Sequence, residues 1–354
     1  MKKNIFLLLF FFCIQCVFSQ TNKEKALKIA EEAIKIMDQG KINESVEMLK
    51  ESQNLDPENF IYPYEIAYSF FLREEYEEAI KILNKVKKYK SINSLVYQMS
   101  GNCYSYMGNP EMAIKEYEEG MKYFPNSGIL YLEKGNVFLH QENYNEAIKN
   151  YEKGIAVEPE FPSNYFRLAK LFLNSTDKLS GIIYGELFMN LERSSKRSLE
   201  MSKLLYDTYK SSITFNENEI KVDFCEIYID AASIKEDGEI DLPLCAIFGK
   251  NFMLAITEEN TINLNSIHSL RTNFIKNYFK DDYKKYPNVL FEYHKIMLDN
   301  DLFEAYNHYL FQMGNQKEFN QWLENNRNKY DEFVKWYVKE ENGITITEAN
   351  RYIR

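Results

Sequence analysis

Small, large apolar and charged positions recur along the first half of the chain with a constant period of about 34 residues. The stretch "GNPEMAIKEYEEGM" begins at Gly108, and the similar stretch "ENYNEAIKNYEKGI" begins one period later at Glu142. In both, apolar residues have the spacing of one helix face, and charged residues lie opposite. A fixed period of this length is typical of repeat proteins, in which each unit buries its apolar face against its neighbours.

Two series of small residues predict two helices in each repeated unit, because helices that cross closely need small side chains at the crossing. Gly40 and Gly108 mark the turn between the two helices. Pro57, Pro125 and Pro159 end the second helix, because proline lacks the N–H that would continue it. The first series is Ala33, Ala67, Gly101, Gly135 and Ala169, and the second is Ser45, Ala79, Ala113, Ala147 and Gly181, with Leu49, Leu83, Tyr117 and Tyr151 as large partners.

This pattern resembles the tetratricopeptide repeat (TPR) family. The family pattern is an aromatic residue, a Leu-Gly pair, Tyr, Ala, Phe and a closing Pro over about 34 residues. "YLEKGNVF" (131–138) followed by "NEAIKNYEKGIAVEP" (145–159) matches it almost throughout. The resemblance covers residues 26–193, with five units starting near 26, 60, 94, 128 and 162. It implies an all-α fold, a superhelical solenoid of about five helix-turn-helix units. Pro63 and Ser91 in the second unit and Gly181 in the fifth depart from the pattern.

The resemblance also implies a binding surface for a protein or peptide. In the family, the first helices line a concave groove that binds an extended peptide or a partner helix. Asn102 and Asn136 share one repeat position and are able to hold an extended backbone, since an amide both donates and accepts; equally, they are simply tolerated on a polar face. The residues that the resemblance places in the groove are Tyr64, Tyr68, Phe71, Gln98, Asn102, Tyr106, Leu132, Asn136, His140, Phe166 and Lys170.

The period is lost after residue 193, and residues 194–354 are expected to form a second, mostly helical domain. Segments 194–212, 242–257, 264–282, 288–301, 302–315 and 317–340 have helical spacing. The stretch 213–230 alternates over a few residues and is a short strand or an extended link. Trp322 and Trp336 are separated by about four helical turns and are expected to share one apolar helix face, more consistent with a core than with a partner surface.

Residues 1–19 have the three parts of a secretory signal peptide: Lys2 and Lys3, an apolar run, and a small residue, Ser19, before the expected cleavage point. The apolar run is too short to span a bilayer. A lipoprotein signal is less favoured, because the residues before Cys13 and Cys16 match it poorly. The signal ending and the Asn/Lys/Ile-rich composition resemble exported proteins of Bacteroidota. We expect a periplasmic or cell-envelope protein with no transmembrane segment after cleavage.

The net charge of the chain and its histidine and cysteine residues disfavour several classes of function. The chain has a net charge of −10 and a pI near 5.2, which disfavours nucleic-acid binding. The four histidines lie in no recognised catalytic or metal-binding motif, so no catalytic residue, metal or cofactor is expected. Cys225 and Cys245 are candidates for a disulfide if the chain is exported, whereas Cys103 in a repeat helix is expected to be a small buried residue.

These observations predict a non-enzymatic interaction or scaffold protein that binds a peptide or partner helix in the TPR groove. Two alternatives stay open. One is an enzyme with a catalytic C-terminal domain and a recruiting TPR half, and the other is a structural solenoid that assembles with copies of itself.

Overall fold

The computed structural model describes residues 21–216, 219–227, 242–257 and 259–354. It is mostly helical, as expected, and divides into two compact units, one ending at Ala147 and the other beginning at Ile148. The division falls inside helix α8 (Tyr144–Val157), so the fourth repeat contributes residues to both units. The predicted signal peptide, 1–19, lies outside the described residues. No helix in the described ranges has the length and apolar character needed to cross a bilayer.

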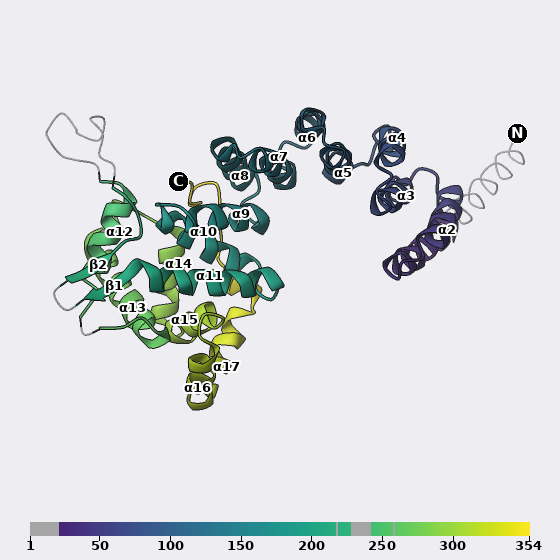
Figure 1. Ribbon diagram of the computed structural model, residues 1–354. Coiled ribbons are helices and arrows are strands. Elements are labelled where there is room, and N and C mark those ends of the chain that lie inside the picture. Colours follow the sequence, from purple (N-terminus) through teal and green to yellow (C-terminus); the bar gives the residue numbers. More distant parts are fainter. Residues whose placement is uncertain (1–20, 217–218, 228–241, 258) are drawn as a thin grey trace, which may run out of the picture. The chain divides into compact units, whose positions relative to one another are not determined.

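The first unit is a series of helix pairs that correspond to the first four predicted repeats, the fourth of which continues into the second unit (Figure 1). The second helices α2, α6 and α8 end two residues before Pro57, Pro125 and Pro159, as predicted. Residues 21–38 are helical, and α2 (Ile42–Leu55), α3 (Ile61–Leu72), α4 (Tyr76–Val86), α5 (Ser94–Tyr106), α6 (Pro110–Tyr123) and α7 (Gly128–His140) follow.

The small residues are buried where the helices of a repeat cross, which confirms their predicted role. Ala67 and Ala79, on the two helices of one pair, have no exposed surface. A Cβ atom added at Gly101 would lie 2.2 Å from the Tyr117 ring. Cys103 is a free, fully buried thiol in the same core, and this burial raises its pKa to about 12. The repeat spacing is therefore a packing requirement.

The turn between the two helices of a repeat has the same backbone conformation in four successive repeats. Gly40, Glu74, Gly108 and Glu142 occupy one repeat position and all have positive φ, at 83°, 62°, 73° and 58°. Glycine adopts this left-handed conformation without steric cost, whereas a residue with a side chain is strained there by about 1 kcal/mol. The turn needs a left-handed residue even where the sequence provides glutamate.

The second unit contains the last repeat pair, a small β-hairpin and the C-terminal helices. Strands β1 (Ile213–Asn216) and β2 (Glu219–Val222) are antiparallel, with Ile213 opposite Val222. The helices are α9 (Pro162–Leu173), α10 (Lys178–Leu191), α11 (Lys196–Ser212), α12 (Leu244–Met253), α13 (Leu264–Asp281), α14 (Val289–Asp299), α15 (Phe303–Phe311), α16 (Gln316–Asn325) and α17 (Arg327–Tyr337), followed by a 3₁₀ turn, η2 (Glu340–Asn342).

Helix α10 forms the centre of this unit. Every residue from Leu179 to Asn190 is buried, including the carboxylate of Glu186. A helix that is buried on all sides needs neighbours on all sides. It packs against α9, α11 and α14. Gly181 permits the closest of these contacts, since an added Cβ would lie 2.5 Å from the Leu173 backbone nitrogen.

The expectation of one helix over 317–340 is wrong. Helix α16 ends at Asn325 and α17 begins at Arg327, so Trp322 and Trp336 lie on two different helices (Figure 1). Asn326 interrupts the helix with φ −126° and ψ 26°, and its side-chain amide donates to the Trp322 carbonyl at 2.9 Å. Asparagine competes with helical hydrogen bonds in this way. Trp322 is buried, whereas Trp336 is half-buried.

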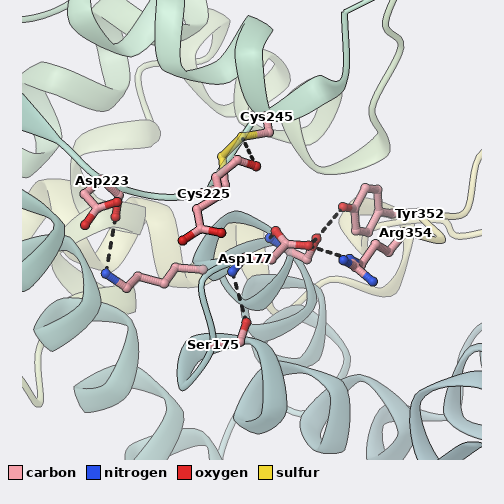
Figure 2. The surroundings of a disulfide bond; sticks show 10 residues. Ser175, Asp177, Asp223, Cys225, Cys245, Tyr352 and Arg354 are labelled. Carbon is pink, nitrogen blue, oxygen red and sulfur yellow. Dashed lines mark hydrogen bonds and ion pairs between the residues drawn. A yellow bond between two sulfur atoms is a disulfide. The ribbon is translucent and has the colours of Figure 1, made fainter. Parts of the chain in front are cut away.

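A disulfide and the C-terminal segment lie near each other in the second unit (Figure 2). Cys225, which follows the hairpin, is bonded to Cys245 in α12, with Cα atoms 6.2 Å apart. The Tyr352 and Ser180 hydroxyl oxygens are 2.9 Å apart, and Arg354 Nε donates to Asp177 Oδ2 at 2.5 Å. The segment after α17 therefore returns to α10 instead of forming a free tail.

Candidate protein-binding surface

Large apolar side chains are exposed on the first helices of the first three repeats. Single exposed apolar residues are common on protein surfaces, but these recur at the repeat spacing. Leu27, Ile61 and Leu95 share one repeat position; Ile34 and Tyr68 share a second, and Leu72 and Tyr106 share a third. We call these seven residues the first-helix surface; their exposed fractions run from 36% to 67%.

Helix geometry places these residues on one face of each first helix. In α3, Ile61, Tyr68 and Leu72 are separated by nearly whole helical turns. The same holds for Leu95 and Tyr106 in α5. Residues at one repeat position line up when repeats stack. The first-helix surface is therefore a strip across three repeats that is apolar or aromatic at seven of its nine positions, the other two being Asp38 and Asn102.

Aromatic rings join two neighbouring repeats within this strip. Tyr68 stacks on Phe71 in α3, with ring centres 6.3 Å apart, and the Phe71 ring meets Tyr106 of α5 edge to face at 5.5 Å. Tyr106 also stacks on Tyr76 of α4 at 5.7 Å. Aromatic rings held in this way offer contact area at low entropic cost, as in many protein interfaces. Tyr106 is 67% exposed despite its two ring contacts.

Acidic residues accompany the apolar strip. Glu31, Glu65 and Glu133 occupy one repeat position, which lies on the helix face between the first two apolar positions. Glu65 is half-buried, and this burial, together with the nearby negative charge of Asp38, raises the pKa of its carboxyl group. Within the described parts of the chain, no lysine or arginine forms an ion pair with any of the three glutamates.

The amide side chains predicted to line the groove already have partners in this unit. Asn102 Oδ1 accepts a hydrogen bond from the Tyr117 hydroxyl at 2.6 Å. Gln98 Nε2 and Asn136 Nδ2 donate to the two carboxylate oxygens of Glu133 at 2.8 and 3.0 Å. The bond from Gln98 connects neighbouring repeats, so the amides contribute to repeat packing as well as to the polar lining.

The structure distributes the eleven predicted groove residues over different environments. In the first unit Tyr68, Tyr106 and His140 are exposed, and Tyr64, Phe71 and the three amides are half-buried. Leu132 is buried and offers little surface. In the second unit Phe166 is also buried, and the cations of Arg197 and Lys170 lie over its ring. Lys170 is paired with Glu200 at 2.8 Å.

Leu27, Ile34, Ile61, Leu72 and Leu95 were not among the predicted groove residues. The prediction rested on small packing residues and on polar groups at the repeat period, and large apolar residues at the same period were not part of it. The signal was present, since Leu27, Ile61 and Leu95 occur at one repeat position. Such residues have no packing role inside a repeat, and their exposure becomes evident only when the neighbouring helices are in place.

The second unit holds a buried charged cluster. Arg271 Nη2 donates to the Glu186 carboxylate at 2.8 Å, and His294 Nε2 is 2.7 Å from Glu186 Oε2. Arg271 and His294 hold the pKa of Glu186 below its ordinary value against the effect of burial, whereas burial lowers the pKa of His294. All three side chains are at most 4% exposed. The cluster ties α10 to α13 and α14 and is closed to a substrate.

The other two histidines of this unit also serve packing. His308 stacks on Trp322 with ring centres 4.0 Å apart, and Trp322 Nε1 donates to Glu304 at 2.9 Å. His268 lies 3.2 Å from the Asn307 amide, and burial lowers its pKa to about 4. The His308 ring is therefore held inside the helical core, and the His268 ring is half-buried at its edge.

An open pocket of about 440 Å³ adjoins the disulfide of the second unit. Asp177, Ser180, Cys245, Tyr352 and Arg354 contribute to its lining, and Figure 2 shows how Asp177 faces the C-terminal residues. Arg354 is already paired with Asp177 there. The polar groups of this pocket thus hold the C-terminal segment in place.

Family models agree with the repeat geometry. The model described as tetratricopeptide repeat matches residues 95–127, and the model described as TPR repeat matches residues 135–175. The chain contains tetratricopeptide repeats. They occupy roughly its first half, and in that family helix pairs of this kind serve protein–protein interaction.

Solved structures show only a distant likeness to the chain. No curated protein matches the chain. MamA from Desulfovibrio magneticus RS-1 is 18% identical over 49% of this chain and 97% of that chain, with a TM-score of 0.37. PilF of Pseudomonas aeruginosa is 17% identical over 54% and 86%, with a TM-score of 0.43. PilW, titled a type IV pilus biogenesis factor, is 14% identical over 52% and 85%, with a TM-score of 0.41. Similarity at this level does not indicate a function for the chain.

Proposed function

We propose that this TPR protein is an exported, non-enzymatic binding protein of the cell envelope, which holds a segment of a partner protein on its first-helix surface. The observation that carries the proposal is the repeat-spaced exposure of Leu27, Ile61 and Leu95 beside the joined rings of Tyr68 and Tyr106. A contiguous apolar strip is costly to leave in water, and a partner that covers it removes that cost.

The proposed location is supported by two independent features. The first is the signal-peptide pattern of residues 1–19, with its resemblance to exported proteins of Bacteroidota. The second is the Cys225–Cys245 disulfide, because disulfides persist in oxidising compartments such as the periplasm.

A non-enzymatic role is supported by the state of the titratable groups. An active site needs acids and bases that a substrate can reach. Glu186, Arg271, His294 and His308 are enclosed in the core, and the half-buried His268 lies 3.2 Å from the Asn307 amide. Their arrangement is typical of a structural network.

Self-assembly is the second candidate function, and one observation favours it. The first repeat has Leu27 and Ile34 exposed, and an apolar terminal repeat is a natural surface for a second copy. Light scattering over a hundredfold concentration range distinguishes the candidates. A monomeric mass throughout supports binding of a different partner, whereas a rising mass that Leu27→Ser abolishes supports self-assembly.

The test of partner binding uses two tyrosines in matched environments. Tyr106 is 67% exposed and stacks on Tyr76 at 5.7 Å, whereas Tyr123 on α6 is 65% exposed and stacks on Tyr97 at the same distance. Proteins captured from envelope extract by the purified chain are compared with those captured by Tyr106→Ala and Tyr123→Ala.

The proposal expects a partner that Tyr123→Ala retains and Tyr106→Ala loses by about tenfold or more, as when an aromatic anchor is removed from an interface. Far-UV circular dichroism and thermal melts confirm that both variants are folded. Equal capture by all three chains would contradict the proposal, because binding would then not involve the first-helix surface.

A further inference from the structure

We infer that the occupant of the first-helix surface is a basic amphipathic helix, whose apolar face covers the apolar strip and whose lysine or arginine side chains reach the glutamates beside it. The inference rests on the proposed function and specifies the chemistry of the partner. It follows from the charges on the strip and from the hydrogen-bonding state of the amides.

On α3 and α5 the charges beside the strip have one sign, whereas the helix of residues 21–38 also carries lysines, among them Lys28 beside Leu27 and Lys35 beside Ile34. Helix α3 carries a single charged residue, Glu65, and α5 carries none. In α7, Lys134 is paired with Glu118 at 2.7 Å, which leaves Glu133 as the charge that acts on this face. The residues at one repeat position thus give carboxylates at Glu31, Glu65 and Glu133 without a cation of this chain's described residues bonded to them.

Glu65 is the carboxylate that would gain most from a cation. It lies on the same helix face as Ile61 and Tyr68, about one helical turn from each. It is half-buried, and the nearby Asp38 adds a second negative charge. A partially desolvated carboxylate beside a like charge is stabilised by an incoming ammonium or guanidinium group. An acidic or neutral segment offers no such compensation.

The amides favour a helix over an extended segment. An extended peptide needs donors and acceptors for its backbone, whereas a helix satisfies its own. On this surface Gln98 Nε2, Asn136 Nδ2 and Asn102 Oδ1 are already bonded to Glu133 and Tyr117. The most exposed side chains of the surface are apolar and aromatic, which suits a partner whose side chains have helical spacing.

The test uses three synthetic peptides of about 20 residues, long enough to be helical. They share one leucine face and differ only in the flanking residues, which are lysine, glutamine or glutamate. Fluorescence anisotropy measures their binding to the purified full chain at low and high salt. We expect the lysine peptide to bind at least about tenfold more tightly than the glutamate peptide, with the difference reduced when salt screens the charges.

Three variants test whether the preference for the lysine peptide arises at the first-helix surface. Glu65→Gln is expected to weaken the lysine peptide about fivefold and to leave the glutamine peptide unchanged, as for the loss of one partly screened ion pair. Glu146→Gln, on helix α8 outside the strip, is the matched control and is expected to change neither. Tyr106→Ala is expected to weaken the lysine and glutamine peptides together.

The outcomes separate this inference from the proposed function. If the three peptides bind equally and Tyr106→Ala weakens all of them, the surface binds a partner but the basic preference is wrong. If the lysine peptide binds no better than the glutamate peptide and Tyr106→Ala changes nothing, the inference is overturned. The proposed function is then decided separately, by the capture experiment with Tyr106→Ala and Tyr123→Ala.

Discussion

Helices α10 and α3 are built from similarly apolar sequences, "KLSGIIYGELFMNL" and "IYPYEIAYSFFL", yet they have different surroundings. In α10 twelve consecutive residues are buried, whereas α3 buries only five of twelve. The difference comes from the neighbours: in the second unit α9, α11 and α14 cover α10. In the first unit the outward face of α3 retains exposed Ile61, Tyr68 and Leu72.

The same contrast holds for the two helices' carboxylates. Glu186 in α10 has Arg271 and His294 as partners inside the chain, whereas Glu65 in α3 has no cation bonded to it among the described residues. Helix α10 therefore has its partners within its own unit, whereas α3 leaves an apolar and acidic strip that we propose another molecule covers.

The largest effect is expected from the charged core of the second unit. Glu186→Ala leaves Arg271 buried without its counter-charge, and breaking a buried pair in this way costs about 3–5 kcal/mol. Urea unfolding followed by circular dichroism should show this loss. Glu65→Ala, the corresponding change on α3, should lower stability by less than about 1 kcal/mol. Equal losses would contradict the contrast between the two carboxylates.

The second-largest loss of stability is expected when the disulfide is removed. Cys225 and Cys245 are 20 residues apart, and a link over such a loop stabilises the fold by roughly 3 kcal/mol. Replacing both by serine should lower the melting temperature to that of the wild-type chain in reductant. Reductant should have no further effect on the double variant. A wild-type chain whose melting temperature is insensitive to complete reduction, shown by thiol titration, would contradict this role.

A smaller effect is expected in the turns of the first unit. Glu74→Gly and Glu142→Gly relieve a side chain held at positive φ and should each stabilise the protein by about 1 kcal/mol. Glu75→Gly, one residue beyond the turn position, provides the control and should bring no gain. Thermal melts measure the three variants, and a destabilised Glu74→Gly chain would show that the glutamate side chain contributes more than strain.

The smallest effect concerns Glu65 and has a definite pH dependence. Its folded-state pKa lies above the ordinary value, so the folded protein binds more protons than the unfolded chain between those two pKa values. The contribution of Glu65 to stability therefore falls as pH rises through this interval. Glu65→Gln should be slightly stabilising at pH 7 and lose that advantage below the ordinary glutamate pKa. Unfolding curves at pH 4 and pH 7 measure the difference, which should be absent if the side chain is fully solvated.

Much of the fold was predictable because its rules are local and periodic. Ala67 and Gly101 share one repeat position, and Ala79 holds the facing one, because the helices of each pair touch there. The C-terminal half offered helical spacing but no period, so its helices were predicted singly. The break at Asn326 was missed because apolar spacing continues across it, and a side-chain bond to the Trp322 carbonyl decides the break.

The candidate site was predictable only in part. Among the predicted groove residues Tyr68 and Tyr106 are exposed, whereas Leu132 and Phe166 are buried. The exposure of a side chain depends on how its neighbours pack. The same repeat position can therefore be buried in one repeat and exposed in the next. The bond of Gln98 to Glu133 likewise joins residues of different repeats and has no signature in the sequence.

The most direct test of the central claim is site-specific photo-crosslinking in the intact envelope, with a photoreactive aromatic residue placed at position 106 or at position 123. The two positions are almost equally exposed and carry the same kind of stacked ring. The account predicts a discrete crosslinked partner from position 106 and none from position 123. A crosslink to the same partner from position 123 alone would contradict it and would move the binding surface to the second helices.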